Sequence, residues 1–173
     1  FNIFLKINKI ASSPVTVTMN ILRLIIFTLL NFGALALGAY LMNGETTGEW
    51  YNTLNKAPWT PPGWVFGAAW FSIMLFFSIY MWRMLDEMKR KQKQFFLLIY
   101  ATHLLLNVIW NLIFFNWHMT LFGLFVIISL TILVLFFLIE GFKNKWYYGA
   151  LVLPYFIWLC IATSLNAYAV FFN

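Results

Sequence analysis

Five long apolar segments, separated by short polar connections, decide what this chain can fold into. They are residues 21–42, 64–85, 95–117, 119–139 and 146–172. Each is long enough to cross about 30 Å of hydrocarbon as a helix. A segment inside a bilayer must satisfy its own backbone hydrogen bonds, which favours helices over isolated strands. The sequence therefore predicts an all-α polytopic membrane protein, built as a bundle of five transmembrane helices in a lipid bilayer.

The composition is that of a chain that lies mostly in lipid. Hydrophobic residues make up 63% and charged residues 9% of the sequence, whereas a soluble domain carries about 25% charged residues. The net charge of +6 comes from bases that lie between the apolar segments. That placement indicates membrane orientation and no nucleic-acid partner.

The positions of the bases predict the orientation of the chain. They gather before or at the start of the first segment, between the second and third, and between the fourth and fifth. Of the eleven Lys and Arg residues, only Lys56 lies elsewhere. The positive-inside rule then places the N-terminus inside and the C-terminus outside, as five spans require.

The first residues of the chain differ from the rest. Residues 1–18 mix apolar, basic, Ser and Pro residues without a clean period, and Met19 directly precedes the first apolar segment. We expect a transmembrane domain over residues 19–173. Residues 1–18 form an N-terminal extension, either non-native upstream sequence or a short interfacial segment.

The connection between the first two helices, residues 43–63, is the longest and contains Trp50 and Trp59. A long aromatic loop on a compact bundle is where a binding lid would lie. Its end, Thr-Pro-Pro-Gly at residues 60–63, is typical of a helix start. Thr60 can cap that helix, and the prolines are tolerated because no amide hydrogen is needed there.

A polar stripe marks the third helix. His103, Asn107, Asn111 and Phe114 lie on one helix face, with Trp110 beside them. An Asn in hydrocarbon needs hydrogen bonds and should face the bundle interior. Two interpretations stay open, namely hydrogen bonds between helices and a polar edge that faces a ligand.

Three tryptophans, Trp70, Trp110 and Trp158, lie inside the spans. A buried indole N–H needs a partner, so these are better ligand candidates than the tryptophans at helix ends. Trp158, Ala162 and Asn166 share one face of the fifth helix. Ala162 would leave room there for a flat ligand or for a close helix.

No catalytic constellation is visible in the sequence. The acids all lie in connections or at helix ends, which disfavours a proton-coupled pump. His103, His118 and Cys160 do not have metal-ligand spacing, so we expect no metal site.

Three blocks of sequence, in a particular order and spacing, carry a family resemblance. The first is WYNTLNKAPWTPPG at residues 50–63, followed by Phe66 and Trp70. The second is LNVIWN at residues 106–111, followed by Phe114-Phe115. The third is Pro154-Tyr155, Trp158, Ala162 and Leu165-Asn166. Together they resemble the TspO/MBR family of translocator proteins and tryptophan-rich sensory proteins.

The resemblance implies five helices, usually a homodimer, and a pocket under the first connection. Members bind porphyrins such as protoporphyrin IX and haem as ligands, with no cofactor required; animal members also bind cholesterol. Some bacterial members promote light-dependent breakdown of protoporphyrin, which makes Trp70 and Trp158 candidate catalytic residues. The positions that match the family's ligand-binding pocket are Tyr51, Pro61, Trp70, Asn107, Trp110, Asn111, Phe114, Trp158 and Ala162.

We therefore expect a bacterial-type membrane sensor that binds a tetrapyrrole. Cholesterol is disfavoured because no base follows Tyr168, as the animal motif requires. One alternative is an enzyme that degrades porphyrin oxidatively in light, which differs from the sensor only by turnover. Another is a transporter of porphyrin or small apolar molecules. A transporter should show inverted repeats and broken helices, and only Pro154 interrupts a span.

Overall fold

The structure, a computed structural model, describes residues 14–173. Its long helices are α2 (Pro14–Leu41), α4 (Gly63–Glu87), α5 (Arg90–Asn111), α6 (Thr120–Asn144) and α7 (Trp146–Phe171). Shorter elements are the 3-10 helix η1 (Glu45–Thr47), α3 (Glu49–Thr53) and the π-helix η2 (Leu112–Asn116), which continues α5. Five of these helices are long and apolar enough to cross a membrane. The predicted five-helix transmembrane bundle is confirmed.

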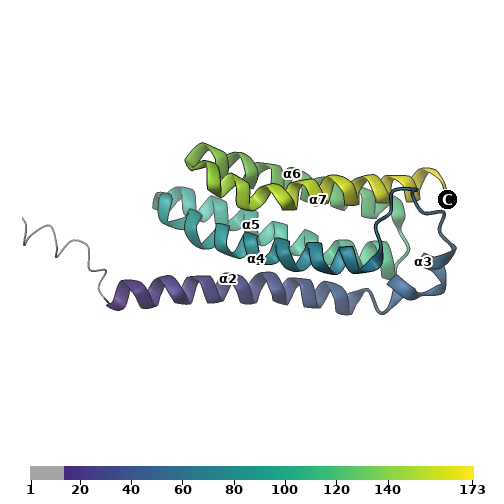
Figure 1. Cartoon of the computed structure of the whole chain (residues 1–173), viewed down its shortest axis with the longest axis horizontal. Helices are drawn as coiled ribbons and strands as arrows, with labels where there is room; N and C mark the ends of the chain where they lie inside the picture. Colours follow the sequence, from purple (N-terminus) through teal and green to yellow (C-terminus); the bar gives the residue numbers. More distant parts are fainter. Residues whose placement is uncertain (1–13) are drawn as a thin grey trace, which may run out of the picture.

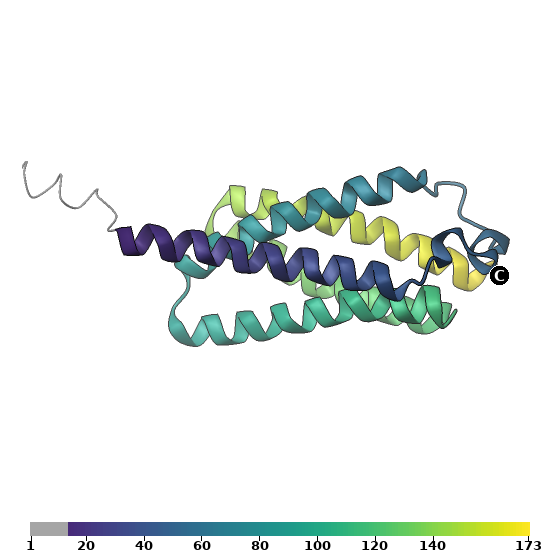
Figure 2. The same cartoon turned by 90° about the horizontal axis from the view of Figure 1, so that it is seen from below.

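The five long helices run lengthwise along the molecule in three layers (Figure 1). Helix α2 forms one outer layer and packs on α4 and α5, while α6 and α7 form the other. Figure 2, which shows the bundle from below, has α2 running lengthwise with α4 on one side of it and α5 on the other. The connection that carries η1 and α3 lies at the same end of the bundle as the C-terminus.

Several helices extend beyond the apolar segments that predicted them. Helix α5 begins at Arg90 and α6 continues to Asn144, so both include polar residues. Hydropathy marks the part of a helix that lies in hydrocarbon, whereas backbone hydrogen bonding continues into the polar interface. Helix α2 begins at Pro14. Residues 1–13 lie outside the described residues, so the nature of the extension at residues 1–18 stays a prediction.

An aromatic cluster in the middle of the bundle joins α4, α6 and α7. The Phe77 ring meets the Phe137 and Tyr155 rings edge-on, with centroids 5.3 Å and 5.5 Å apart. The buried Tyr80 hydroxyl donates a hydrogen bond to the Phe137 carbonyl at 2.8 Å. Each such aromatic pair contributes about 0.5–1.5 kcal/mol beyond the area that it buries.

Helix α2 is held by a buried polar group that hydropathy alone does not explain. Asn31, which is fully buried, donates to the Ser78 hydroxyl on α4 at 2.9 Å. Its carbonyl oxygen accepts a hydrogen bond from the Tyr100 hydroxyl on α5 at 2.9 Å. Apolar packing gives little orientation between helices in lipid, so these directional bonds fix how α2 sits on its neighbours.

Candidate ligand-binding site

The chain between α2 and α4, residues 43–62, folds over one end of the bundle; we call it the lid. Asn43 and Gly44 have φ angles of 52° and 78°, and this left-handed turn ends α2 and starts the lid. Helix α4 begins at Gly63, with Pro62 at its N-cap position. The prediction that Thr60 caps α4 is wrong, because its hydroxyl donates to the Ala57 carbonyl at 2.7 Å instead.

A cavity of about 50 Å³ lies between the lid and the helices below it. The lid supplies one side of it. The α5–η2 aromatic residues, Phe66 of α4 and a face of α7 supply the rest. The lining residues are Tyr51, Leu54, Asn55, Lys56, Ala57, Thr60, Phe66, Trp110, Phe114, Phe115, Ala162, Leu165, Asn166 and Ala169.

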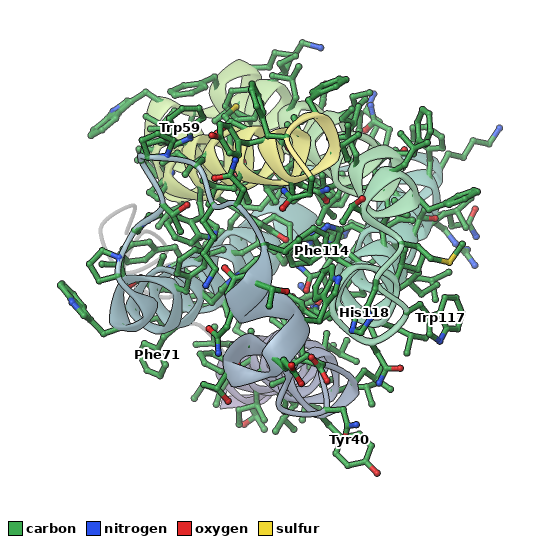
Figure 3. All side chains as sticks on the ribbon, turned by 90° about the vertical axis from the view of Figure 1, so that its right-hand side faces the viewer. Tyr40, Trp59, Phe71, Phe114, Trp117 and His118 are labelled. Atoms are coloured by element: carbon green, nitrogen blue, oxygen red, sulfur yellow. The ribbon has the colours of Figure 1, made fainter. Side chains whose placement is uncertain are left out.

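One wall of the cavity is built from stacked aromatic rings. Trp110 and Phe114 stack with centroids 5.4 Å apart and planes 15° apart, and Phe115 meets Phe114 edge-on at 4.9 Å. The π-helical turn lets the consecutive residues Phe114 and Phe115 both be buried. Figure 3 shows Phe114 near the centre of the bundle end, while Trp117 and Tyr40 point outward.

A face of α7 forms another wall of the cavity. Ala162 and Ala169 are both buried and have only methyl side chains. Asn166, between them, accepts a hydrogen bond from the Trp110 indole at 3.1 Å and donates to the Thr120 carbonyl at 2.9 Å. The amide of Asn166 therefore holds the aromatic wall, α6 and α7 in place around the cavity.

Contacts on three sides hold the lid closed. The Trp50 ring stacks on His118, with centroids 4.2 Å apart. The Trp59 indole donates a hydrogen bond to the Ser164 hydroxyl at 3.1 Å. The Asn55 backbone amide donates to the Asn173 side chain at 2.7 Å. Both of these hydrogen bonds are solvent-exposed, so each stabilises the closed lid by only a small free energy.

The charged side chain in the cavity lining is Lys56, whose Nζ lies 4.1 Å from the centre of the Tyr51 ring. Burial raises the pKa of the Tyr51 hydroxyl, so this group stays a neutral hydrogen-bond donor. The polar edge of the cavity therefore lies on the lid side and combines a cation with a neutral donor.

The structure divides the predicted site residues into two groups. Four line the cavity, namely Tyr51, Trp110, Phe114 and Ala162. Five lie outside its lining, namely Pro61, Trp70, Asn107, Asn111 and Trp158. All of the second group except Pro61 belong to helices that also supply lining residues, but they lie at other depths or on other faces.

The inner part of the α5 polar stripe joins helices. The Asn107 amide donates to the Tyr155 hydroxyl on α7 at 2.7 Å, and His103 Nε2 lies 2.8 Å from the same oxygen. Asn111 donates to the Asn107 carbonyl of its own helix at 2.9 Å. A Cβ placed on Gly38 would come within 2.6 Å of the Asn111 amide, so α2 approaches α5 closely there. Of the two interpretations left open by the sequence, hydrogen bonding between helices applies to His103 and Asn107.

The two candidate catalytic tryptophans lie deeper in the bundle than the cavity. Trp70 meets the Tyr155 ring edge-on at 5.9 Å. Trp158 is buried and meets Phe66, a lining residue, edge-on at 5.2 Å. The indole N–H of Trp158 has no hydrogen-bond partner among the described residues. It is thus a buried, unpaired donor one ring away from the cavity.

Sequence reasoning missed several lining residues. Asn166 was grouped with Trp158 and Ala162 on one helix face but was not assigned to the pocket, and Ala169 continues the same stripe, so period alone could have extended the prediction to both. Phe115 enters through the π-helical turn, and the lid residues 54–57 lie in irregular structure. Neither of these features has a sequence period that could be followed.

Comparison with known proteins now decides the family. Residues 24–171 match the TspO/MBR family. The chain belongs to this family. It is 34% identical over 125 residues to the tryptophan-rich sensory protein of Cereibacter sphaeroides, an alignment that covers 72% of this chain and 77% of that protein. It is 30% identical over 152 residues to the tryptophan-rich protein TspO of Archaeoglobus fulgidus, covering 86% and 95%.

An animal protein is also similar to this chain, at a comparable level of identity. The translocator protein of Homo sapiens is 29% identical over 132 residues, which cover 75% of this chain and 77% of that protein. Family membership confirms the resemblance found in the three sequence blocks. This TspO/MBR chain is an integral membrane protein, and its family supports a sensory or translocator role in the membrane.

Proposed function

We propose that this TspO/MBR protein is a membrane receptor that binds a tetrapyrrole, such as protoporphyrin IX or haem, beneath the lid. The observation that carries the proposal is the pairing of two unlike walls. The stacked rings of Trp110 and Phe114 face a cavity whose other wall includes Ala162 and Ala169. A flat apolar ring stacks on indole and phenyl faces, and methyl side chains leave a slot beside them.

The polarity of the cavity suits the two propionates of such a ligand. A carboxylate buried without a partner costs several kcal/mol, so the propionates must reach cations, donors or water. Lys56, Asn55 and the Tyr51 hydroxyl stand on the lid side of the cavity. We infer that the ring enters with its propionate edge toward the lid and its apolar edge toward the bundle.

Binding on this account requires the lid to move. The closed cavity of about 50 Å³ is far smaller than the ~300–1,000 Å³ that pockets for such ligands occupy. The described structure is then the closed form, and the apparent affinity is the intrinsic affinity scaled by the fraction of open protein. Because the hydrogen bonds that hold the lid are exposed and individually weak, thermal motion can populate the open form.

A titration tests the proposal and separates it from its alternative. The purified full chain in nanodiscs is mixed with protoporphyrin IX in the dark, and the porphyrin absorbance is followed. A saturable spectral shift at one ligand per chain supports the receptor. Absence of saturable binding, with both protoporphyrin IX and haem, overturns it.

The same samples are then illuminated. Loss of the porphyrin spectrum with formation of a product would favour the degrading enzyme, for which Trp158 and Trp70 are the candidate residues. A spectrum that survives illumination at the rate of free porphyrin in empty nanodiscs favours the receptor alone.

We also propose that the lid faces the outside of the cell and the N-terminus the inside, because the bases lie mostly at the end of the bundle away from the lid. A cysteine placed at Thr47 of the lid, with Cys160 replaced by Ser, should react with an impermeant reagent in intact cells. A matched cysteine at Lys89 should react only after permeabilisation, and the reverse pattern would refute the orientation.

The homodimer implied by the family stays a prediction that light scattering of the purified protein can check.

A further inference from the structure

A second hollow lies at the end of the bundle opposite the lid, between the last turns of α4 and the first turns of α7; we call it the α4/α7 groove. Its volume is about 450 Å³. Its lining residues are Ile79, Arg83, Asp86, Glu87, Lys145, Tyr147, Tyr148 and Leu151. In Figure 1 this is the end where α4 leads into α5 and α6 into α7.

The groove changes character with depth. Its charged residues lie at the helix ends, whereas Ile79 lies one helical turn deeper than Arg83 and Leu151 one turn deeper than Tyr147. The four residues between each pair correspond to about 6 Å along the helix axis. The groove is therefore charged at the level of the membrane surface and apolar at the level where acyl chains begin. A phospholipid has the same profile.

Most of the charges in the groove already have partners. Glu87 accepts hydrogen bonds from the Lys145 ammonium at 2.5 Å and from the Tyr148 hydroxyl at 3.0 Å. Asp86 forms an ion pair with Arg23 of α2. Each of these pairs is electrically neutral, so the remaining net charge of the groove comes from Arg83.

Arg83 has no carboxylate within ion-pair distance in the part of the chain that the structure describes. Its guanidinium lies 4.0 Å from the centre of the Trp82 ring, a contact that orients it. Among the described residues, no acceptor takes a hydrogen bond from its N–H groups. A guanidinium held in this way presents parallel donors that match two oxygens of a phosphate. The groove thus carries one unneutralised positive charge with the geometry for a single phosphate.

The carboxylates add a second requirement. Only one oxygen of Glu87 and one of Asp86 accept hydrogen bonds from the described residues, so the other oxygen of each is open to a donor. A headgroup that carries donors beyond its phosphate, such as the ammonium of ethanolamine, can use them. The trimethylammonium of choline has no N–H to donate.

We propose that the α4/α7 groove binds the headgroup of a membrane phospholipid of the ethanolamine class. Arg83 holds the phosphodiester, Asp86 and Glu87 accept from the ammonium, and Ile79 and Leu151 contact the start of an acyl chain. This site is separate from the cavity under the lid and does not depend on the tetrapyrrole proposal.

Native mass spectrometry of the full chain, released from nanodiscs that hold equal amounts of phosphatidylethanolamine and phosphatidylcholine, tests the proposal. These lipids have the same net charge and differ in the donors of the headgroup. We expect the chain to retain phosphatidylethanolamine preferentially. Arg83→Gln should reduce the retained lipid roughly fivefold, the effect of one basic contact at a membrane surface, and Arg83→Lys should restore it partly.

Arg90→Gln is the matched control, because Arg90 is an exposed base at the same end of the bundle and lies outside the groove. It should leave retention unchanged. Equal losses in the two Gln variants, or none in Arg83→Gln, would overturn the site. Equal retention of both lipids would overturn the headgroup assignment. Displacement of the lipid by millimolar inorganic phosphate would show that the groove takes free phosphate instead.

Discussion

Ser164→Ala should speed the entry of protoporphyrin IX by releasing one side of the lid. Ser164 accepts the Trp59 indole hydrogen bond at 3.1 Å, and this pair is solvent-exposed. An exposed hydrogen bond of this kind contributes about 0.5–1 kcal/mol, which corresponds to a roughly two- to fivefold larger fraction of open lid. Because entry requires the open lid, the association rate should rise by the same factor.

Stopped-flow quenching of tryptophan fluorescence, with porphyrin in excess, measures this rate. The fold should survive the change, since among the described residues the only other hydrogen bond of the Ser164 hydroxyl is to the Ile161 carbonyl of its own helix. Ser129→Ala is the control, because the exposed Ser129 hydroxyl donates to the Phe125 carbonyl of its own helix at 2.8 Å and has no hydrogen bond to the lid in the described part of the chain. An unchanged rate in Ser164→Ala, or an equal rise in Ser129→Ala, would refute the role of the lid as a gate.

Three further changes test the bundle and its deeper residues. Tyr155→Phe leaves the buried Asn107 amide without its hydroxyl acceptor, so the free energy of unfolding in detergent should fall by about 1–3 kcal/mol; an unchanged value would show that water replaces the hydroxyl. Gly141→Ala brings a Cβ within 2.9 Å of the Gly149 backbone nitrogen, so the same measurement should show a loss of about 1–3 kcal/mol from overpacking, and a neutral effect would mean that α6 and α7 separate easily. Trp158→Phe should weaken porphyrin binding by less than about tenfold, because the unpaired indole loses no hydrogen bond and most of its apolar surface remains; a larger loss in the dark titration would place the ligand directly against this ring.

The sequence was sufficient for the bundle because lipid leaves few choices. A long apolar segment has to be a helix in a bilayer, and each of the five predicted segments lies largely within one long helix. The polar ends of α5 and α6, such as the run from Arg90, were missed because hydropathy does not report backbone hydrogen bonding outside hydrocarbon.

The sequence predicted which helix faces point toward the cavity, but not how far along each helix the cavity extends. Periodicity grouped Asn107 with Phe114 on one face of the third helix, and both are buried. Seven residues of helix, about 10 Å, nevertheless separate them, and only Phe114 reaches the lid. The depth at which the lid stops is set by the prolines and by contacts such as Trp50 on His118, which join distant parts of the sequence.

Ligand affinity in Ala162→Leu tests the central claim most directly. Ala162 is buried and lines the cavity, and the larger side chain would occupy much of its 50 Å³. Ala150→Leu, the same change at an exposed position of α7, is the control. Both proteins are checked for helicity and unfolding before protoporphyrin IX is titrated in the dark. If the tetrapyrrole binds between the aromatic wall and α7, the Kd of Ala162→Leu should rise at least about tenfold while that of Ala150→Leu stays at the wild-type value. A folded Ala162→Leu protein that binds protoporphyrin IX as tightly as the wild type would contradict the account.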